Sequence, residues 1–149
     1  MHIKNLLTPE RCLAKHTCSS KKRLLEKLAE LIAQNTPGIS AELLFTQLIN
    51  RERLGSTGVG EGIAIPHCRF DTQGATLGAL ITLAEPIDFD AVDNQPVDVV
   101  FAMLVPTDAN EQHLLTLASL AEALQSQHYV EGLRQSTDNT GLFLAAAGT

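Results

Sequence analysis

The chain of 149 residues is 44% hydrophobic and 19% charged, an ordinary globular composition, and its length predicts one domain over residues 1–149. Its net charge of −6 argues against a nucleic-acid partner, because such proteins carry a basic patch. No apolar run approaches the roughly 20 residues of a membrane helix, and the N-terminus lacks the apolar core of a signal peptide. Three irregularly spaced cysteines make no disulfide framework, so we expect a cytoplasmic protein that does not insert into membranes.

Two amphipathic helices are predicted in the N-terminal third of the chain. The first begins at residues 19–20, repeats its apolar residues every three or four positions and is broken at residues 37–38. The second is capped by Ser40 and ends at Gly55, which leaves Arg51 in its last turn. The basic residues of the first helix are expected to form a solvated face: Lys21, Lys22, Arg23 and Lys27.

Strands and then further helices follow. Four extended segments are predicted from their apolar residues: 63–65, 76–83, 86–89 and Val97–Val105. The last is apolar at nearly every position, which indicates a strand buried on both faces. Three helices complete the chain, one opened by a capping box at Asp108-x-x-Glu111 and two shorter ones at 129–134 and 142–147. This order predicts an α/β fold, a mixed β-sheet flanked by helices on both faces.

A glycine-rich segment, GSTGVGEG at residues 55–62, is the first candidate for chemistry. Gly55 and Gly60 have the spacing of a phosphate-binding P-loop, but Glu61 stands where that loop requires Lys, and a carboxylate repels phosphate. The dinucleotide fingerprint G-x-G-x-x-G is not matched either. The segment also follows a helix and precedes a strand, which reverses the order found in both motifs. These observations exclude a nucleotide-binding loop.

His67 follows a proline, directly after the predicted strand at 63–65. Neutral imidazole is a nucleophile toward phosphorus at neutral pH, and the phosphoramidate that it forms can be passed on. Such a site needs N–H donors for the phosphate oxygens and a permanent cation, and it must exclude water. Amides of the glycine-rich segment and of a helix N-terminus can act as donors, and Arg51 as the cation.

His113 lies in the first turn of the helix that follows Val97–Val105. If that strand runs beside the strand at 63–65, both histidines emerge at one edge of the sheet, where open α/β sheets bind ligands. His113 can then hydrogen-bond an incoming phosphate, although histidine in a first helical turn is as often an ordinary structural residue.

Two other chemistries are disfavoured. Cys12, His16 and Cys18, or His67 with Cys68, lack the ligand spacing of a zinc site, so we expect no metal. Ser56 lies in G-S-T-G, which is not the G-x-S-x-G elbow of a hydrolase nucleophile.

A family resemblance joins these residues. Glu52 and the run VGEGIAIPHC at 59–68 resemble the active-site signature of IIA components of the bacterial phosphoenolpyruvate-dependent phosphotransferase system, in the fructose–mannitol class. The runs RERLGSTGVGEGIAIPH at 51–67 and FDAVDNQPVDVVFAMLVP at 89–106, followed by HLLTLASLAE, look most like its nitrogen-regulatory branch. The resemblance covers nearly all of the chain and implies a mixed sheet flanked by helices.

The resemblance also implies roles for single residues. By this similarity His67 is phosphorylated by an HPr-like phosphocarrier (NPr), Arg51 stabilises the phosphate charge, and His113 orients the phosphate by a hydrogen bond. We expect Ser56, Thr57 and Gly58 to form the loop at the phosphate, and we expect no cofactor.

Two positions near the site are unusual for this resemblance. Cys68 stands where glycine is common, and we expect it only to restrict the local backbone; the alternative is that its thiol makes the site sensitive to oxidation. Glu61 is an acid near an incoming phosphate, and we expect it to point to solvent.

Two functions remain open, both of them for a phosphotransferase component rather than a stand-alone metabolic enzyme. The first is a nitrogen- and potassium-linked regulator whose phosphorylation state controls binding to targets such as potassium-transport or sensor-kinase proteins. The second is a sugar-specific component that passes phosphate to a IIB domain. A degenerate binding module without chemistry is a weaker third reading, because Arg51, His67 and His113 are all present.

Overall fold

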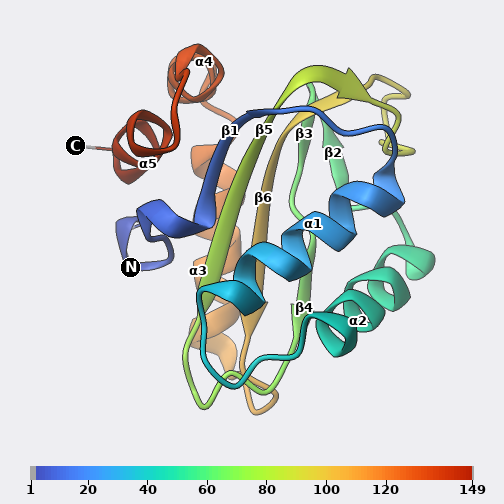
Figure 1. Cartoon of the computed structure of the whole chain (residues 1–149), viewed down its shortest axis with the longest axis vertical. Coiled ribbons are helices and arrows are strands. Elements are labelled where there is room, and N and C mark those ends of the chain that lie inside the picture. The colour runs from blue at the N-terminus through green and yellow to red at the C-terminus, as the bar shows by residue number, and fades with distance from the viewer. Residues whose placement is uncertain (1–2, 149) are drawn as a thin grey trace.

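The computed structural model describes residues 3–148 and has the predicted α/β fold, a six-stranded mixed sheet with helices on both faces (Figure 1). The helices are α1 (Lys21–Gln34), α2 (Ala41–Leu54), α3 (Glu111–Ala123), α4 (Gln127–Gln135) and α5 (Asn139–Ala147), preceded by the short 3₁₀ helices η1 (Ile3–Asn5) and η2 (Pro9–Arg11). The strands are β1 (Cys12–His16), β2 (Gly58–Gly60), β3 (Ile63–Ala64), β4 (His67–Arg69), β5 (Leu77–Ile87) and β6 (Val97–Val105).

Strand β6 is the centre of the sheet. The strand order is β1-β5-β6-β3-β2, and β4 also pairs with β6. Strand β5 runs antiparallel to β6, whereas β3 and β4 run parallel to it. Ile63 pairs with Val99 and His67 with Met103, so β3 and β4 follow β6 in one continuous register. Pro66 lies in the gap between them, and it has no N–H to donate to the ladder.

Both faces of β6 are buried, as predicted. Successive side chains of a strand point to opposite faces. Val100 and Leu104 belong to the core under α1 and α2, and Phe101 and Met103 to the core under α3, α4 and α5. Figure 1 shows α1 and α2 on one side of the sheet and α3 on the other. Two cores thus account for a strand that is apolar at nearly every position.

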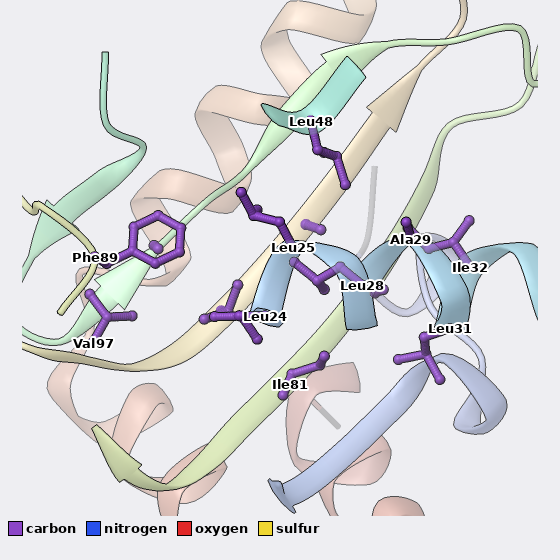
Figure 2. Packing of buried hydrophobic residues seen from close by; sticks show 14 of the residues in the cluster. Leu24, Leu25, Leu28, Ala29, Leu31, Ile32, Leu48, Ile81, Phe89 and Val97 are labelled. Carbon is purple, nitrogen blue, oxygen red and sulfur yellow. The ribbon is translucent and has the colours of Figure 1, made fainter. Parts of the chain in front are cut away.

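The first two helices begin where the sequence predicts. The side chain of Ser20 accepts a hydrogen bond from the N–H of Arg23, and that of Ser40 from the N–H of Leu43. The leucines of α1 lie against the sheet, as Figure 2 shows for Leu24 and Leu25 among the buried residues of this core. The solvated face of α1 is confirmed for Lys22 and Arg23, which are exposed, but not for Lys21, whose ammonium is paired with a buried carboxylate.

The predicted start of α3 is wrong by two residues. The N-cap is Asn110 rather than Asp108, and the third helical residue of the capping box is His113 rather than Glu111. The N–H of Ala109 bonds the carbonyl of Pro106, so a turn after β6 keeps Asp108 outside the helix. A capping motif in sequence does not reveal such a turn, which depends on where the preceding strand ends.

Three short strands escape prediction, and one is longer than predicted. Strands β1, β2 and β4 have three to five residues each, too few for a clear alternation of apolar and polar side chains. The expected segments 76–83 and 86–89 contribute to the single strand β5, which ends at Ile87. Its pairing with β6 is irregular between Thr82 and Ile87, which is where Pro86 is tolerated.

We expect Leu25→Ala to lower the free energy of unfolding by about 2–5 kcal/mol, because Leu25 is fully buried and its loss leaves a cavity between α1 and the sheet. Leu43→Ala on α2 is the control, since Leu43 is 63% exposed and its loss should change stability by no more than about 0.5 kcal/mol. Urea unfolding followed by circular dichroism measures both. Equal losses would contradict the core assigned to α1.

Candidate functional site

A cavity of about 390 Å³ opens between α2, β4 and α3. Its lining residues come from four elements: Gln47, Asn50, Arg51 and Leu54 of α2, His67, Cys68 and Arg69 of β4, Met103 and Val105 of β6, and Leu114 and Leu117 of α3. Arg51 and His67, which the sequence places at one site, therefore share this cavity. The parallel pairing of β4 with β6 brings them beside α3, which follows β6 in the chain.

His67 is the first residue of β4, and its ring is held by the backbone. Its Nδ1 lies 2.7 Å from the carbonyl oxygen of Ile65. A carbonyl oxygen can only accept, so Nδ1 carries the proton and donates it to this bond. In the neutral ring the other nitrogen, Nε2, is then left with the lone pair. The half-buried imidazole thus offers a nucleophile at one defined atom.

Arg51 is fixed beside the same cavity by the end of its own helix. Its Nη1 donates to the carbonyl oxygen of Gly55 at 2.9 Å, just past the last residue of α2. A guanidinium has five N–H donors and stays charged at any pH that a protein tolerates. The bond to Gly55 therefore orients Arg51 and leaves further donors for an anion in the cavity.

His113 lies next to the cavity rather than in its wall. The described lining residues of α3 are Leu114 and Leu117, and Leu114 is the neighbour of His113 in the chain. The backbone N–H of Asn110 donates to Nδ1 of His113 at 3.1 Å, as the second half of the capping box. In the neutral ring the proton must then lie on Nε2, so His113 offers an N–H donor where His67 offers a lone pair.

The loop residues Ser56, Thr57 and Gly58, expected from the sequence to surround the phosphate, have other partners. The N–H of Thr57 donates to the Glu52 carboxylate at 3.2 Å, and the N–H of Gly58 to Oγ of Ser56 at 3.0 Å. The hydroxyl of Ser56 donates to the Phe89 carbonyl at 2.9 Å. None of the three is among the described residues that line the cavity. Their polar groups hold the loop to α2 and to the segment around Phe89.

Packing also explains part of the glycine content of this segment. A Cβ on Gly58 would lie 2.8 Å from the Cβ of Ala91, so only glycine fits there.

Glu61 is exposed, as predicted, and its N–H donates to Oδ2 of Asp93 at 2.9 Å. The bonds from the N–H groups of Glu61 and Gln95 lower the pKa of Asp93, because they favour the carboxylate.

Arg69 is a second cation of the cavity, and no role is predicted for it from the sequence. Its Nη1 lies 3.3 Å from the carbonyl oxygens of Thr107 and Ala109, which links β4 to the loop that enters α3. Residues i and i+2 of a strand share one face, so recognising β4 in the sequence would have placed Arg69 on the face of His67.

Metal ligands and membrane spans are not found in the described part of the chain. Within residues 3–148, no three His, Cys, Asp or Glu side chains gather in a way that suits a metal ion. No helix of that range has the length and apolar character needed to cross a membrane. Cys12, Cys18 and Cys68 form no disulfide bond with one another.

Comparison with known proteins identifies the family. The model of the family described as "Phosphoenolpyruvate-dependent sugar phosphotransferase system, EIIA 2" matches residues 5–144. The chain belongs to this EIIA family. The nitrogen regulatory protein of Pseudomonas aeruginosa is 41% identical to this EIIA chain over 143 residues, which cover 96% of this chain and 93% of that protein.

Further relatives agree with this assignment. The crystal structure of the nitrogen regulatory protein IIA-Ntr from Neisseria meningitidis matches this EIIA fold with a TM-score of 0.88 at 34% identity, covering 97% of this chain and 98% of that one. The PTS system fructose-specific EIIA component of Haloferax volcanii is 33% identical over 118 residues, 79% of this chain and 77% of that protein. The similarity to the two nitrogen regulatory proteins thus extends over more of the chain than the similarity to the fructose-specific component does.

Cys68 is the residue of this EIIA site with a strongly shifted pKa. Burial in the cavity wall raises the pKa of the Cys68 thiol to about 12, because the charged thiolate loses its hydration. The thiolate is the form that oxidants and alkylating agents attack. At neutral pH the residue is therefore a protonated thiol, which argues against the oxidation sensitivity that the sequence leaves open.

We expect Cys68 to react with iodoacetamide at pH 8 at least about tenfold more slowly than free cysteine, because so little of it is thiolate there. The rate should rise with pH toward the raised pKa of about 12. Mass spectrometry on a Cys12→Ala, Cys18→Ser double variant isolates the reaction of Cys68. A rate equal to that of free cysteine at pH 8 would show that the thiol is not buried as described.

Proposed function

We propose that this protein is a phosphohistidine carrier of the phosphotransferase system, which accepts a phosphoryl group on His67 from an HPr-like phosphocarrier (NPr) and acts as a regulatory IIA protein. The observation that carries the proposal is the 2.7 Å hydrogen bond between Nδ1 of His67 and the Ile65 carbonyl, in a cavity shared with Arg51. This bond leaves Nε2 as the nucleophile, and Arg51 places a permanent positive charge beside it.

The transfer exchanges one nitrogen–phosphorus bond for another. The lone pair on Nε2 of His67 attacks phosphorus while the bond from phosphorus to the carrier's imidazole breaks, and the electron pair of that bond returns to the carrier's ring. The His67 ring then holds the phosphoryl group on Nε2 and the proton on Nδ1, so it is positively charged. The Ile65 carbonyl stabilises this charge. Because both bonds are of one kind, the group can be passed on again.

Two neighbours suit the negative oxygens of the phosphoryl group. Arg51 can donate several N–H groups to them, and His113 can donate its Nε2–H. Apolar side chains surround the opening, where Leu54 is 85% and Leu114 is 52% exposed. A protein partner that covers these leucines would exclude water and so protect the phosphohistidine from hydrolysis.

The similarity to nitrogen regulatory proteins over 96% of the chain supports a regulatory role. Phosphorylation adds about −1.5 to −2 charges to a protein whose net charge is already −6, which can switch partner binding by repulsion. Potassium-transport or sensor-kinase proteins are the kind of target that we propose. The similarity to a fructose-specific component favours a second candidate, transfer of phosphate from His67 to a sugar-specific IIB domain.

We expect the purified chain to take up an acid-labile, alkali-stable phosphate when incubated with phosphoenolpyruvate, the first enzyme of the system and an HPr-like carrier. His67→Ala should take up none, because it lacks the nucleophile. Radiolabel transfer followed by gel electrophoresis measures this, and His128→Ala, which removes an exposed histidine of α4 outside the cavity, is the matched control. Equal labelling of wild type and His67→Ala would refute the assignment of His67.

The same assay separates the two candidate functions. Faster transfer from the nitrogen-branch carrier than from the sugar-branch carrier supports the regulator. Rapid loss of label to an added fructose- or mannitol-type IIB domain supports the sugar-specific component.

We expect His113→Ala to slow phosphoryl transfer by about 100-fold, the usual cost of losing one hydrogen-bond donor at a charged transition state. Asn110→Ala is the matched control, since it breaks the same capping box but keeps the imidazole. Each variant should lose about 1 kcal/mol of stability. Rapid-quench kinetics measures the transfer rate, and urea unfolding measures the stability. Equal transfer rates for both variants would show that His113 only caps the helix.

A further inference from the structure

Glu52 is a buried acid in an unfavourable position. Its side chain is only 5% exposed, and it lies in the last turn of α2, where the helix dipole opposes a negative charge. Three donors converge on its carboxylate. The ammonium of Lys21 lies 2.8 Å away, the N–H of Thr57 lies 3.2 Å away, and the hydroxyl of Thr57 also donates to it. The carboxylate therefore holds the loop residue Thr57 firmly to the end of α2.

The hydrogen bonds continue from Thr57 to His67. The carbonyl of Thr57 accepts the N–H of Ile65 at 2.9 Å, and the carbonyl of Ile65 accepts Nδ1–H of His67 at 2.7 Å. On the far side, the carbonyl of Pro66 accepts the N–H of Met103 at 2.9 Å. Residues 65 and 66 are thus held between the loop and β6, and the acceptor for the imidazole has one defined place.

We propose that Glu52 is a positioning residue for His67, which acts through Thr57 and keeps the proton of the imidazole on Nδ1. This inference rests on the proposed function of His67 as the phosphate acceptor. If Thr57 moves, the carbonyl of Ile65 loses its place, the Nδ1–H tautomer loses its partner, and the lone pair no longer stays on Nε2.

The chemistry of the group explains why it is an acid. A carboxylate has only acceptors, and all three of its neighbours are donors. Glutamine has the same shape, but its NH₂ group would face either the ammonium of Lys21 or the donors of Thr57. Lys21 makes a buried glutamate tolerable at this position, because its ammonium balances the negative charge of Glu52. The same ammonium lies 4.6 Å from the centre of the Phe89 ring.

The test measures the tautomer of His67 in the full chain without any phosphate. Long-range ¹H–¹⁵N NMR spectra of the imidazole show whether Nδ1 or Nε2 carries the proton. We expect mostly Nδ1–H in the wild type and a raised Nε2–H population in Glu52→Gln and in Thr57→Val. We also expect phosphoryl transfer to slow by about 10–100-fold in both variants, as for other residues that orient a functional histidine.

Two controls separate positioning from general stability. Thr57→Ser keeps the hydroxyl and should restore both the tautomer and the rate. Tyr129→Phe removes a remote hydrogen bond, 2.7 Å from the Tyr129 hydroxyl to the Ala146 carbonyl, and should change stability without changing the tautomer. Thr57→Val is the milder variant, so the comparison stands even if Glu52→Gln does not fold.

An unchanged tautomer in Thr57→Val, with a rate no lower than in Tyr129→Phe, would overturn the positioning role. The proposed function fails in a different way, through absence of label on the wild-type protein with any carrier. In that case the tautomer comparison still decides whether Glu52 positions the ring.

Discussion

The residues of β6 present apolar side chains to both faces of the sheet, so the strand is stable only with a helical layer on each side and a paired strand along each edge. Helices α1 and α2 form one layer, and α3, α4 and α5 the other. One edge is paired with β5 and the other with β3 and β4. The position of the candidate site follows from this arrangement, because the parallel partner strand β4 carries His67 and the chain beyond β6 becomes α3.

The backbone around Pro66 joins the sheet to the candidate site. The carbonyl of Pro66 accepts the N–H of Met103 and keeps this segment paired with β6, although Pro66 has no N–H of its own to donate. Ile65 is bonded on the other edge of the strand, where its N–H bonds the loop at Thr57 and its carbonyl bonds the imidazole of His67. The backbone bonds that anchor this segment therefore also fix the acceptor that orients the His67 ring.

The charges at the site are few, and each is held in place. Arg51 and Arg69 both donate to backbone carbonyls beside the cavity, and the buried acid Glu52 is matched by Lys21 and Thr57. Long side chains that are already oriented lose little further freedom when an anion arrives. In a chain with a net charge of −6, these fixed cations give the cavity a local positive charge, which the proposed phosphate site requires.

The sequence by itself determined what depends on neighbours in the chain. The caps Ser20 and Ser40 and the doubly buried strand Val97–Val105 are local patterns, and His67 with Arg51 belongs to a contiguous signature. Only the tertiary structure decided which strands pair, because backbone pairing joins segments far apart in the sequence. It also decided the start of α3 at Asn110.

The tertiary structure also decided which partners the polar groups near the site have. The amides expected to bind phosphate at Thr57 and Gly58 are bonded inside the protein, and Glu52 is buried against a lysine that lies more than 30 residues earlier in the chain. Local sequence fixes which groups are donors and acceptors. Which of them meet depends on how the helices pack on the sheet, since burial forces each polar group to find a partner wherever the fold brings one.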